Sequence, residues 1–456
     1  MRLSEATRDR LPPDIARFSY DRSAQKIGIV HFGLGAFHRA HQAWYTDLAM
    51  SHGERDWGIC GVSLRSPAVA EQLDPQDGLY TLTERSGTEA ATRLIGAIRE
   101  VLVAAHDRDA IIARIAAPEC RIATFTVTEK GYARAPDGSL DRSLGTASFY
   151  PLLAEGLEKR RAAGLTGLTL LSCDNLPDNG RTLARLLGEW IEVPHLAEWV
   201  KSDCTCPGTM VDRIVPATTE ADLDALEARI GLRDEGAVFT EHFSQWVIED
   251  RFAGSRPGWD KVGAQLVTDV APYETAKLRM LNGAHSALAY LGLENHCTFV
   301  HEAIADPQLR PLVDRLMREE AATSFVPAAG QDLDGYADAL IARFSDPALN
   351  HRLIQIAMDG SQKIPQRWLE TLAFHQRRGA SCPAILEALG AWIRHVRGDA
   401  RPVDDPMAGK LATLWSTAGH HGVAAALFGG RGMFARYWTA DEATLDELTA
   451  RLTAPG

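Results

Sequence analysis

The sequence contains few cysteines, no long apolar run and no excess of positive charge. Its 456 residues include seven cysteines, an odd number spread from Cys60 to Cys382. This is sparse for a disulfide scaffold and typical of a reducing compartment. No run of eighteen apolar residues occurs, so no membrane span is expected, and the N-terminus lacks the apolar core of a signal peptide. We therefore expect a cytoplasmic protein.

The charge and the cysteine spacing exclude further classes of partner. A formal net charge of −12 disfavours nucleic acid or an anionic membrane surface as the main partner. A local site can still bind a small anion, because it does not depend on the net charge. The close pair Cys204 and Cys206 lacks a second pair at zinc spacing, so no metal site is expected. With 45% hydrophobic and 24% charged residues, the chain resembles an ordinary globular protein of two domains.

Strand and helix patterns alternate in the first half of the chain. Residues 1–24 are polar and are expected to form a surface arm. Four buried strands are then expected, separated by helical spacings. In order, the expected segments are 26–32, 40–52, 57–62, 107–116, 122–127, 147–163 and 168–172. This alternation predicts a mostly parallel sheet.

Helical spacing dominates from about residue 266 onward, and loops with Pro or Gly separate the segments. The expected helices are 271–291, 307–321, 333–344, 349–358, 366–378, 383–397 and 441–453. The sequence therefore predicts an α/β domain over 1–265, followed by a mainly α-helical domain over 266–456.

A dinucleotide-binding turn is expected where the first strand ends. Gly33 and Gly35 lie between that strand and a helix, and Ala36 and Phe37 follow them. Glycine allows the tight bend and lets a phosphate approach the backbone, while the helix N-terminus faces the pyrophosphate. The third glycine of the usual motif is absent, and His38 stands in its place. An ordinary glycine-containing turn is therefore the alternative.

The end of the second expected strand bears on the choice of dinucleotide. NAD-binding proteins often carry an acid there, which holds the ribose hydroxyls. Here the strand ends Ser63-Leu64-Arg65-Ser66, without an acid. Arg65 could contact a 2′-phosphate or lie on the surface, so both NAD and NADP stay open.

Four polar side chains are expected on one face of the first long helix of the second domain. Lys277, Asn282 and His285 follow Glu274 at offsets of three, eight and eleven, within an arc of about 140° on an α-helix. A lysine whose pKa is lowered by burial can take a hydroxyl proton. An asparagine amide can hold the oxygen as negative charge builds on it. The pattern favours alcohol chemistry without a metal, and a solvated polar face is the alternative.

Other polar segments are candidates for ligand contacts. Asn175 follows an expected strand at its carboxyl end, where open α/β sheets bind ligands, although an Asx-rich turn is as plausible. Asp212 could bind a substrate hydroxyl or form an ion pair with Arg213. Lys363, in an expected polar loop over 359–367, could reach a substrate or belong to a cap and turn.

Taken together, five segments of the chain resemble the polyol-specific long-chain dehydrogenases, the mannitol dehydrogenase family. That family also contains fructuronate and tagaturonate reductases and arabinitol dehydrogenases. Its diagnostic motif is similar to the Lys-x4-Asn-x2-His helix of this chain. The five segments are Gly33–Gln42, Thr128–Tyr132, Ser172–Asn175, Thr209–Pro216 and Lys277–His285.

The resemblance implies a fold, a reaction and a set of site residues. It implies a Rossmann-like N-terminal domain, an α-helical C-terminal domain, and reversible hydride transfer between NAD(P) and a secondary alcohol without zinc. Lys277 would be the general base. Asn175 and Asn282 would hold the alkoxide, and His285 would contact a substrate hydroxyl.

The substrate is less clearly implied than the reaction. Asp212 and Lys363 would lie on the substrate side, and Glu274 would gate the proton path of the base. Some mannitol enzymes carry an arginine where this chain has Gln355, and the segment that follows is closer to fructuronate reductases. Arg367 would then face a substrate carboxylate or lie on the surface. A hexitol such as mannitol and an aldonate such as mannonate both stay open.

Two other classes of protein are alternatives to a metal-independent dehydrogenase. A nucleotide-binding sensor would keep the glycine turn but need not keep Lys277 with both Asn175 and Asn282, so their joint presence argues against it. A zinc-dependent alcohol dehydrogenase would need a Cys/His/Glu ligand set that the sequence lacks. We therefore expect a metal-independent enzyme that binds a small polyol, ketose or sugar acid, and the resemblance favours a monomer.

Overall fold

The chain forms two compact units, Met1–Val270 and Ala271–Gly456, in a computed structural model that describes residues 1–87 and 89–453. The boundary expected at 265/266 stays a prediction. Among the described residues, no helix is long and apolar enough to cross a membrane.

The first unit is built around a five-stranded sheet of order β5-β2-β1-β6-β7, in which every neighbouring pair is parallel. Phe32 of β1 lies opposite Val62 of β2 and Phe125 of β6. The strand order reverses between β1 and β6, and such a switch point opens a ligand crevice at the carboxyl ends of the strands. The predicted parallel sheet is confirmed. Its strands are β1 Ile27–Phe32, β2 Gly58–Ser63, β5 Ile98–Val103, β6 Ile122–Phe125 and β7 Thr169–Ser172.

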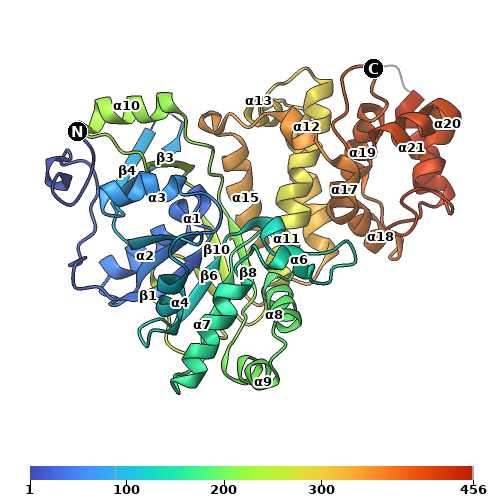
Figure 1. The fold of residues 1–456 in the computed structure, drawn as a ribbon. Coiled ribbons are helices and arrows are strands. Elements are labelled where there is room, and N and C mark those ends of the chain that lie inside the picture. The colour runs from blue at the N-terminus through green and yellow to red at the C-terminus, as the bar shows by residue number, and fades with distance from the viewer. Residues whose placement is uncertain (88, 454–456) are drawn as a thin grey trace. The chain divides into compact units, whose positions relative to one another are not determined.

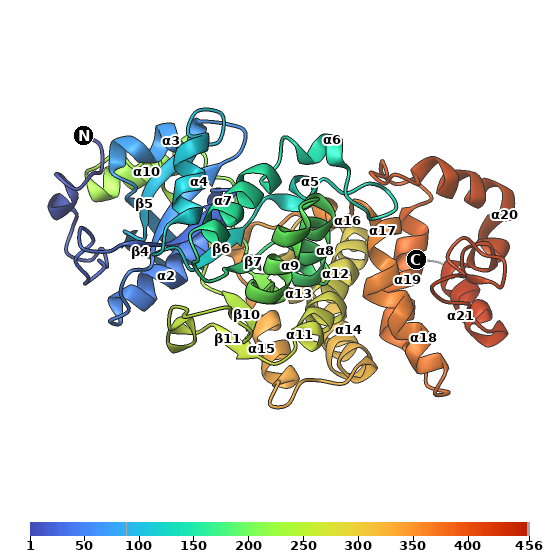
Figure 2. The same cartoon turned by 60° about the horizontal axis from the view of Figure 1, so that its bottom comes forward.

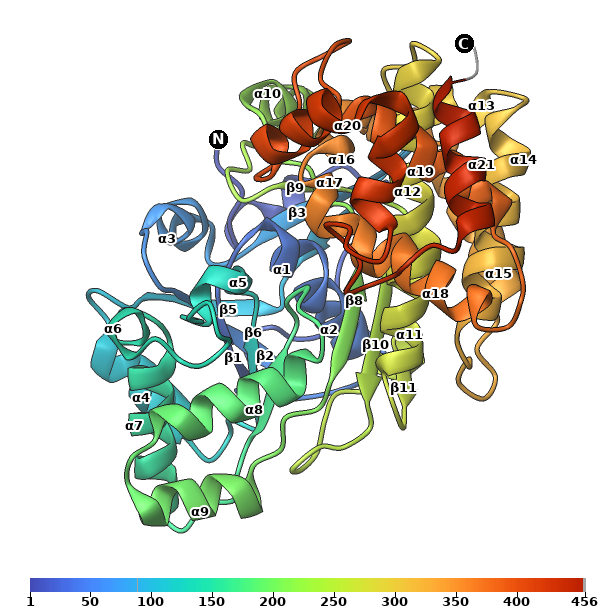
Figure 3. The same ribbon diagram turned by 90° about the vertical axis from the view of Figure 1, so that its right-hand side faces the viewer.

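Helices cover both faces of this sheet, which is why its strands are almost continuously apolar. On one face, Val30 and Phe32 pack with residues of α4 and α7, which lie side by side (Figure 3). On the other face, Ile29 and Ile59 pack with residues of α2. The helices of this unit are α1 Ala36–Ala40, α2 Gln42–Ser51, α3 Ala68–Leu73, α4 Arg108–Ala116, α5 Thr128–Gly131, α6 Arg142–Gly145, α7 Tyr150–Ala162, α8 Asn179–Trp190, α9 Pro194–Asp203 and α10 Glu220–Ile230, with 3-10 turns η1 Arg8–Arg10, η2 Asp74–Gln76 and η3 Trp259–Val262.

Two small sheets extend the first unit. One has the order β4-β3-β9 and the other β11-β10-β8, and each mixes parallel and antiparallel pairs. The sequence analysis missed these strands because they lack the continuous apolar runs of the central sheet. They are β3 Tyr80–Ser86, β4 Glu89–Ile95, β8 Thr209–Asp212, β9 Val238–Glu241, β10 Gln245–Glu249 and β11 Gln265–Val267.

The N-terminal segment is not the surface arm that its polar composition predicts. Leu3, Leu11 and Ile15 are buried in a small core with residues of α10, and the chain end lies beside that helix (Figure 1). The Leu3 N–H donates to the Arg233 carbonyl at 2.9 Å. A few apolar residues spaced along a polar segment were sufficient to anchor it.

The second unit is helical, as predicted, and α12 forms its centre. The helices α13, α14, α16 and α19 pack around α12 (Figure 2), which is apolar on most of its circumference, as expected for a core helix. The helices are α11 Ala271–Ala276, α12 Asn282–Glu294, α13 Val300–Ala305, α14 Leu309–Arg315, α15 Leu333–Phe344, α16 Leu353–Ala357, α17 Gly360–Ile364, α18 Glu370–Gln376, α19 Pro383–His395, α20 Ala408–Phe428 and α21 Glu442–Thr453, with 3-10 turns η6 Ala322–Ser324 and η7 Pro347–Leu349.

Three π-helical turns interrupt the described helices of this unit: η4 Lys277–Leu281, η5 Leu316–Ala321 and η8 Pro365–Leu369. The prediction of one regular helix over 271–291 is therefore wrong in detail, because the π turn η4 joins α11 to α12. The polar loop expected over 359–367 is also wrong, because this segment forms α17 and η8. Asp405, distant in sequence, accepts hydrogen bonds from the Ser361 N–H and hydroxyl at 2.7 and 2.6 Å and so caps the start of α17.

Candidate functional site

The first glycine after β1 is required by the backbone itself. Gly33 has a φ of +94°, a region that L side chains rarely adopt, and a Cβ there would overlap the Thr126 carbonyl oxygen. The Gly33 N–H donates to the Val62 carbonyl at 2.9 Å, and the Thr126 hydroxyl donates to the Gly33 carbonyl at 2.8 Å. The turn is therefore fixed between β2 and β6, at the switch point of the sheet.

The second glycine borders open space. A Cβ at Gly35 would meet nothing nearer than the Gly33 carbonyl oxygen at 3.8 Å, and Gly35 directly precedes the first residue of α1, Ala36. Phe37 follows, and its ring stacks on that of His41 at 5.1 Å. A cradle left open by a missing side chain, beside N–H groups at a helix start, fits the phosphates of a dinucleotide.

His38 stands where the third glycine would be, and its side chain is fully buried. Its ring stacks on that of His31, with 3.3 Å between the ring centroids. Burial lowers the pKa of both histidines, that of His31 to about 3, so both rings are neutral at neutral pH. Any contact between His38 and a dinucleotide would have to come from its backbone.

Because His31 is buried, the folded protein is expected to lose stability in acid. Its pKa of about 3 lies below the ordinary 6.5, so the unfolded chain binds the proton more readily than the folded protein. This contribution to the free energy of unfolding is fully present above pH 6.5 and is lost as the pH falls toward 3. At pH 5 the loss is about 2 kcal/mol.

The test compares urea denaturation of wild type and His31→Gln at pH 8 and pH 5. Glutamine keeps polar atoms near Thr124, which binds the His31 Nδ1 at 2.7 Å, but cannot be protonated. The denaturation midpoint should fall further in wild type than in the variant between the two pH values. Equal falls would show that protonation of His31 does not contribute.

Arg65 lies in the turn that follows β2, with an exposed side chain. The Ser63 hydroxyl donates to the Ser66 carbonyl at 2.6 Å and so closes this turn. Because β2 neighbours β1 in the sheet, the turn lies at the carboxyl edge near the glycine cradle. An exposed cation at this position is able to contact a ribose phosphate.

Asn175 lies just past β7, at the same edge of the sheet, with an exposed side chain. Its neighbour Asp174 is buried and was not singled out by the sequence analysis. The Asp174 carboxylate accepts the N–H groups of Val127 and Thr128 at 3.0 and 2.8 Å, and the Tyr132 hydroxyl at 2.9 Å. Burial raises the pKa of Asp174 to about 6. Asp174 thus ties the turn after β6 to the turn that presents Asn175.

Asp212 ends β8, opposite Gln245 of β10, and is almost fully buried. The neighbouring Arg213 forms an ion pair with Glu84 and donates to the Ala40 carbonyl at 2.7 Å. A carboxylate at the end of a strand, fixed by the sheet, is suited to accept a hydroxyl hydrogen bond.

In the second unit, η4 separates Lys277 from Asn282. On an α-helix, side chains five residues apart point about 140° away from each other. A π turn closes hydrogen bonds between residues five apart, so these two side chains lie close to one turn apart. Both are half-buried, as is Glu274 in the preceding α11. The polar face therefore spans a narrower arc around the helix axis than it would on a regular α-helix.

His285 lies on α12, on the turn after Asn282. Its ring contacts that of Phe344, with centroids 4.7 Å apart, and that of His351 at 5.4 Å. Burial is the first cause that lowers the pKa of His285, and the charges of His351, Arg343 and Arg367 lower it further. A neutral imidazole among cationic groups can still exchange hydrogen bonds with a hydroxyl.

Lys363 on α17 and Arg367 on η8 lie beside α12. The Lys363 ammonium donates to the Met358 carbonyl at 2.5 Å, and its pKa is lowered by burial and then by Arg367. The Arg367 guanidinium donates to the Ser286 hydroxyl at 2.7 Å and the Asn282 carbonyl at 3.3 Å. The surface role allowed for Arg367 is wrong, because its side chain is half-buried, with a pKa lowered to about 10.

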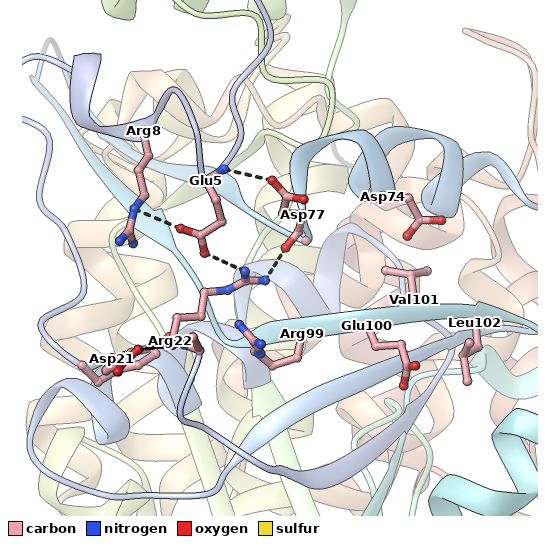
Figure 4. A pocket seen from close by; sticks show the side chains of 13 residues that line it. Glu5, Arg8, Asp21, Arg22, Asp74, Asp77, Arg99, Glu100, Val101 and Leu102 are labelled. Carbon is pink, nitrogen blue, oxygen red and sulfur yellow. Dashed lines mark hydrogen bonds and ion pairs between the residues drawn. The ribbon is translucent and has the colours of Figure 1, made fainter.

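A separate cleft of about 690 Å³ runs beside the edge strand β5 (Figure 4). Arg22 crosses it, with an ion pair to Glu5 at 2.7 Å and a hydrogen bond to the Asp77 carbonyl. The residues that line this cleft include none of those expected at the site. We assign it no role in the chemistry.

The comparisons with known proteins cover both units. The family model for the mannitol dehydrogenase Rossmann domain matches residues 27–261, and that for the mannitol dehydrogenase C-terminal domain matches residues 269–453. D-mannonate oxidoreductase of Escherichia coli strain K12 is 41% identical over 416 residues, which are 86% of each chain.

Two solved structures agree with this family. A substrate-free D-sorbitol dehydrogenase has a TM-score of 0.91 at 31% identity, over 98% of this chain and 96% of the other. Pseudomonas fluorescens mannitol 2-dehydrogenase, solved with NAD and D-mannitol, has a TM-score of 0.79 at 33% identity, over 99% of each chain. These matches confirm the resemblance and the enzyme class expected from the sequence: the chain is an oxidoreductase that belongs to the mannitol dehydrogenase family.

Proposed function

We propose that this protein is an NAD(P)-dependent, metal-independent oxidoreductase that interconverts a secondary alcohol of a polyol and a ketose, as in mannitol and fructose. The observation that carries the proposal is the π turn η4, which brings Lys277 and Asn282 close to one turn apart on a half-buried helix face. A proton acceptor beside an amide donor is the minimum that alcohol oxidation needs from the protein.

The glycine turn is the proposed dinucleotide site. The backbone around Gly33, Gly35, Ala36 and Phe37 would hold the phosphates, with His38 contributing only through its backbone. When bound, a nicotinamide dinucleotide accepts or supplies the hydride. NAD is the expected cofactor, and the exposed Arg65 would also accommodate the 2′-phosphate of NADP.

The proposed chemistry assigns each polar group one task. Lys277 accepts the hydroxyl proton as hydride leaves the substrate carbon, and returns it in the reverse direction. The Asn282 amide donates to the substrate oxygen while that oxygen carries negative charge, and Asn175 would supply a second amide to the same atom. Glu274, one turn before Lys277, would pass the proton onward to solvent.

The remaining proposed contacts concern the other substrate hydroxyls. His285, Asp212 and Lys363 would each exchange a hydrogen bond with the polyol chain. Such contacts orient the substrate and do not take part in the bond changes.

A second candidate substrate is a sugar acid, as in the conversion of mannonate to fructuronate. The observation that favours it is the positive charge near His285, which Arg343 and Arg367 supply. Lys363 also lies beside Arg367. Such an environment attracts a carboxylate, because opposite charges stabilise each other most where burial removes screening water. The 41% identity to a D-mannonate oxidoreductase points the same way.

The test is a screen for oxidation of NADH and NADPH by the purified protein with fructose, fructuronate, tagaturonate and xylulose. The leading proposal expects turnover with fructose above the others, unchanged after EDTA treatment. Preferred turnover of fructuronate would establish the second candidate instead. No turnover with any pair would overturn the catalytic proposal and favour a nucleotide-binding sensor.

A further inference from the structure

The π turn η4 is held in place by contacts from other helices. A π turn breaks the regular hydrogen-bond ladder of an α-helix and is rarely stable alone, so it persists only where its surroundings fix it. Here η4 packs against both other π turns of the unit, η5 and η8. Arg279, inside η4, donates to the Ser324 carbonyl and hydroxyl, both at 2.9 Å. It also forms an ion pair with Glu370 at 3.0 Å.

The residues of η8 bind the helix immediately after η4. The Arg367 guanidinium donates to the carbonyl of Asn282 and the hydroxyl of the buried Ser286. The next side chain, the buried Trp368, donates its indole N–H to the Gly283 carbonyl at 3.2 Å. Two neighbouring donors thus engage the carbonyls of the first two residues beyond the π turn.

We infer that Arg367 is a positioning residue, which holds the π turn between Lys277 and Asn282 and thereby sets the geometry of the base relative to the amide. It acts through the backbone of Asn282 and the side chain of Ser286. Without these bonds η4 loses the restraint on the residue that follows it, although the Arg279 contacts stay, and a return to the α-helical ladder would turn Lys277 and Asn282 apart. This inference rests on the proposed roles of those two residues.

The test compares Arg367→Met with Arg367→Lys, and Arg377→Met, an exposed arginine after α18, is the control. Arg367→Met is expected to lower kcat by up to about 10²-fold, the effect of misplaced catalytic groups, with an unchanged KM for the dinucleotide. Arg367→Lys keeps one charged donor and should recover part of the loss. Hydrogen exchange of the amides over 277–286 should accelerate in Arg367→Met, and the pH profile of kcat should shift.

Each contrary result has a distinct meaning. A rise confined to the KM for fructuronate, with unchanged turnover of fructose, would show a direct carboxylate contact and overturn the positioning role. Unchanged kcat and exchange would also overturn it. If Arg367→Met does not fold, Trp368→Phe removes the donor to Gly283 together with part of a buried ring and should lower kcat in the same way. A normal kcat in that variant would overturn the positioning role. Lys277→Ala, measured in parallel, tests the proposed function separately.

Discussion

Lys277→Ala is expected to lower kcat by about 10²–10⁴-fold, the usual contribution of a general base, while the dinucleotide still binds. Lys277 begins η4 in the second unit, whereas the glycine cradle belongs to the first. Removal of the amine should therefore leave the KM for the dinucleotide unchanged. The measurement is steady-state turnover of the best substrate of the screen, with dinucleotide binding followed by fluorescence titration.

The pH profile sharpens this test. In the oxidation direction, kcat should fall at low pH in wild type, because a protonated base cannot accept the hydroxyl proton, and this limb should disappear in Lys277→Ala. Small primary amines added to the variant should restore part of the rate. Lys410→Ala, which removes an exposed lysine of α20, is the matched control. Near-normal turnover of Lys277→Ala would remove the residue from the role of base.

Gly33→Ala and Gly35→Ala are expected to have opposite effects on stability. At Gly33 the φ of +94° and the overlap with the Thr126 carbonyl should cost on the order of 3 kcal/mol. At Gly35 the φ is −103° and the space is open, so alanine should be neutral or stabilise by about 0.5 kcal/mol through the unfolded chain. Thermal denaturation without ligand measures both changes.

Dinucleotide binding should be weakened by Gly35→Ala, the substitution that is not expected to lower stability. A methyl group at Gly35 would occupy the space proposed for a phosphate, so Gly35→Ala should raise the Kd for NADH and NADPH about 10-fold or more, or 1.4 kcal/mol. Gly409→Ala, in exposed and open space on α20, is the control for a glycine substitution without a site. Wild-type affinity of a well-folded Gly35→Ala would place the dinucleotide elsewhere.

Much of the fold could be predicted because its signals are local. The four strands expected at 26–32, 57–62, 122–127 and 168–172 are strands of the central sheet, since buried parallel strands are short and almost continuously apolar. The helices of the second unit follow from their spacing. The segment 359–367 could not be predicted as helical, because its cap is supplied by Asp405, more than forty residues further along the chain.

The sequence by itself determined the residue types of the candidate site and the family to which the chain belongs, because motif spacing is a property of the chain alone. Tertiary structure decided which groups are buried and what they touch. The Arg367 side chain faces α12, His38 stacks on His31 beneath the glycine turn, and η4 replaces a regular helical turn. The Arg367 contacts and the π turn depend on packing between segments far apart in the sequence, and the histidine stack depends on how the turn after β1 folds back, so local propensity alone does not select them.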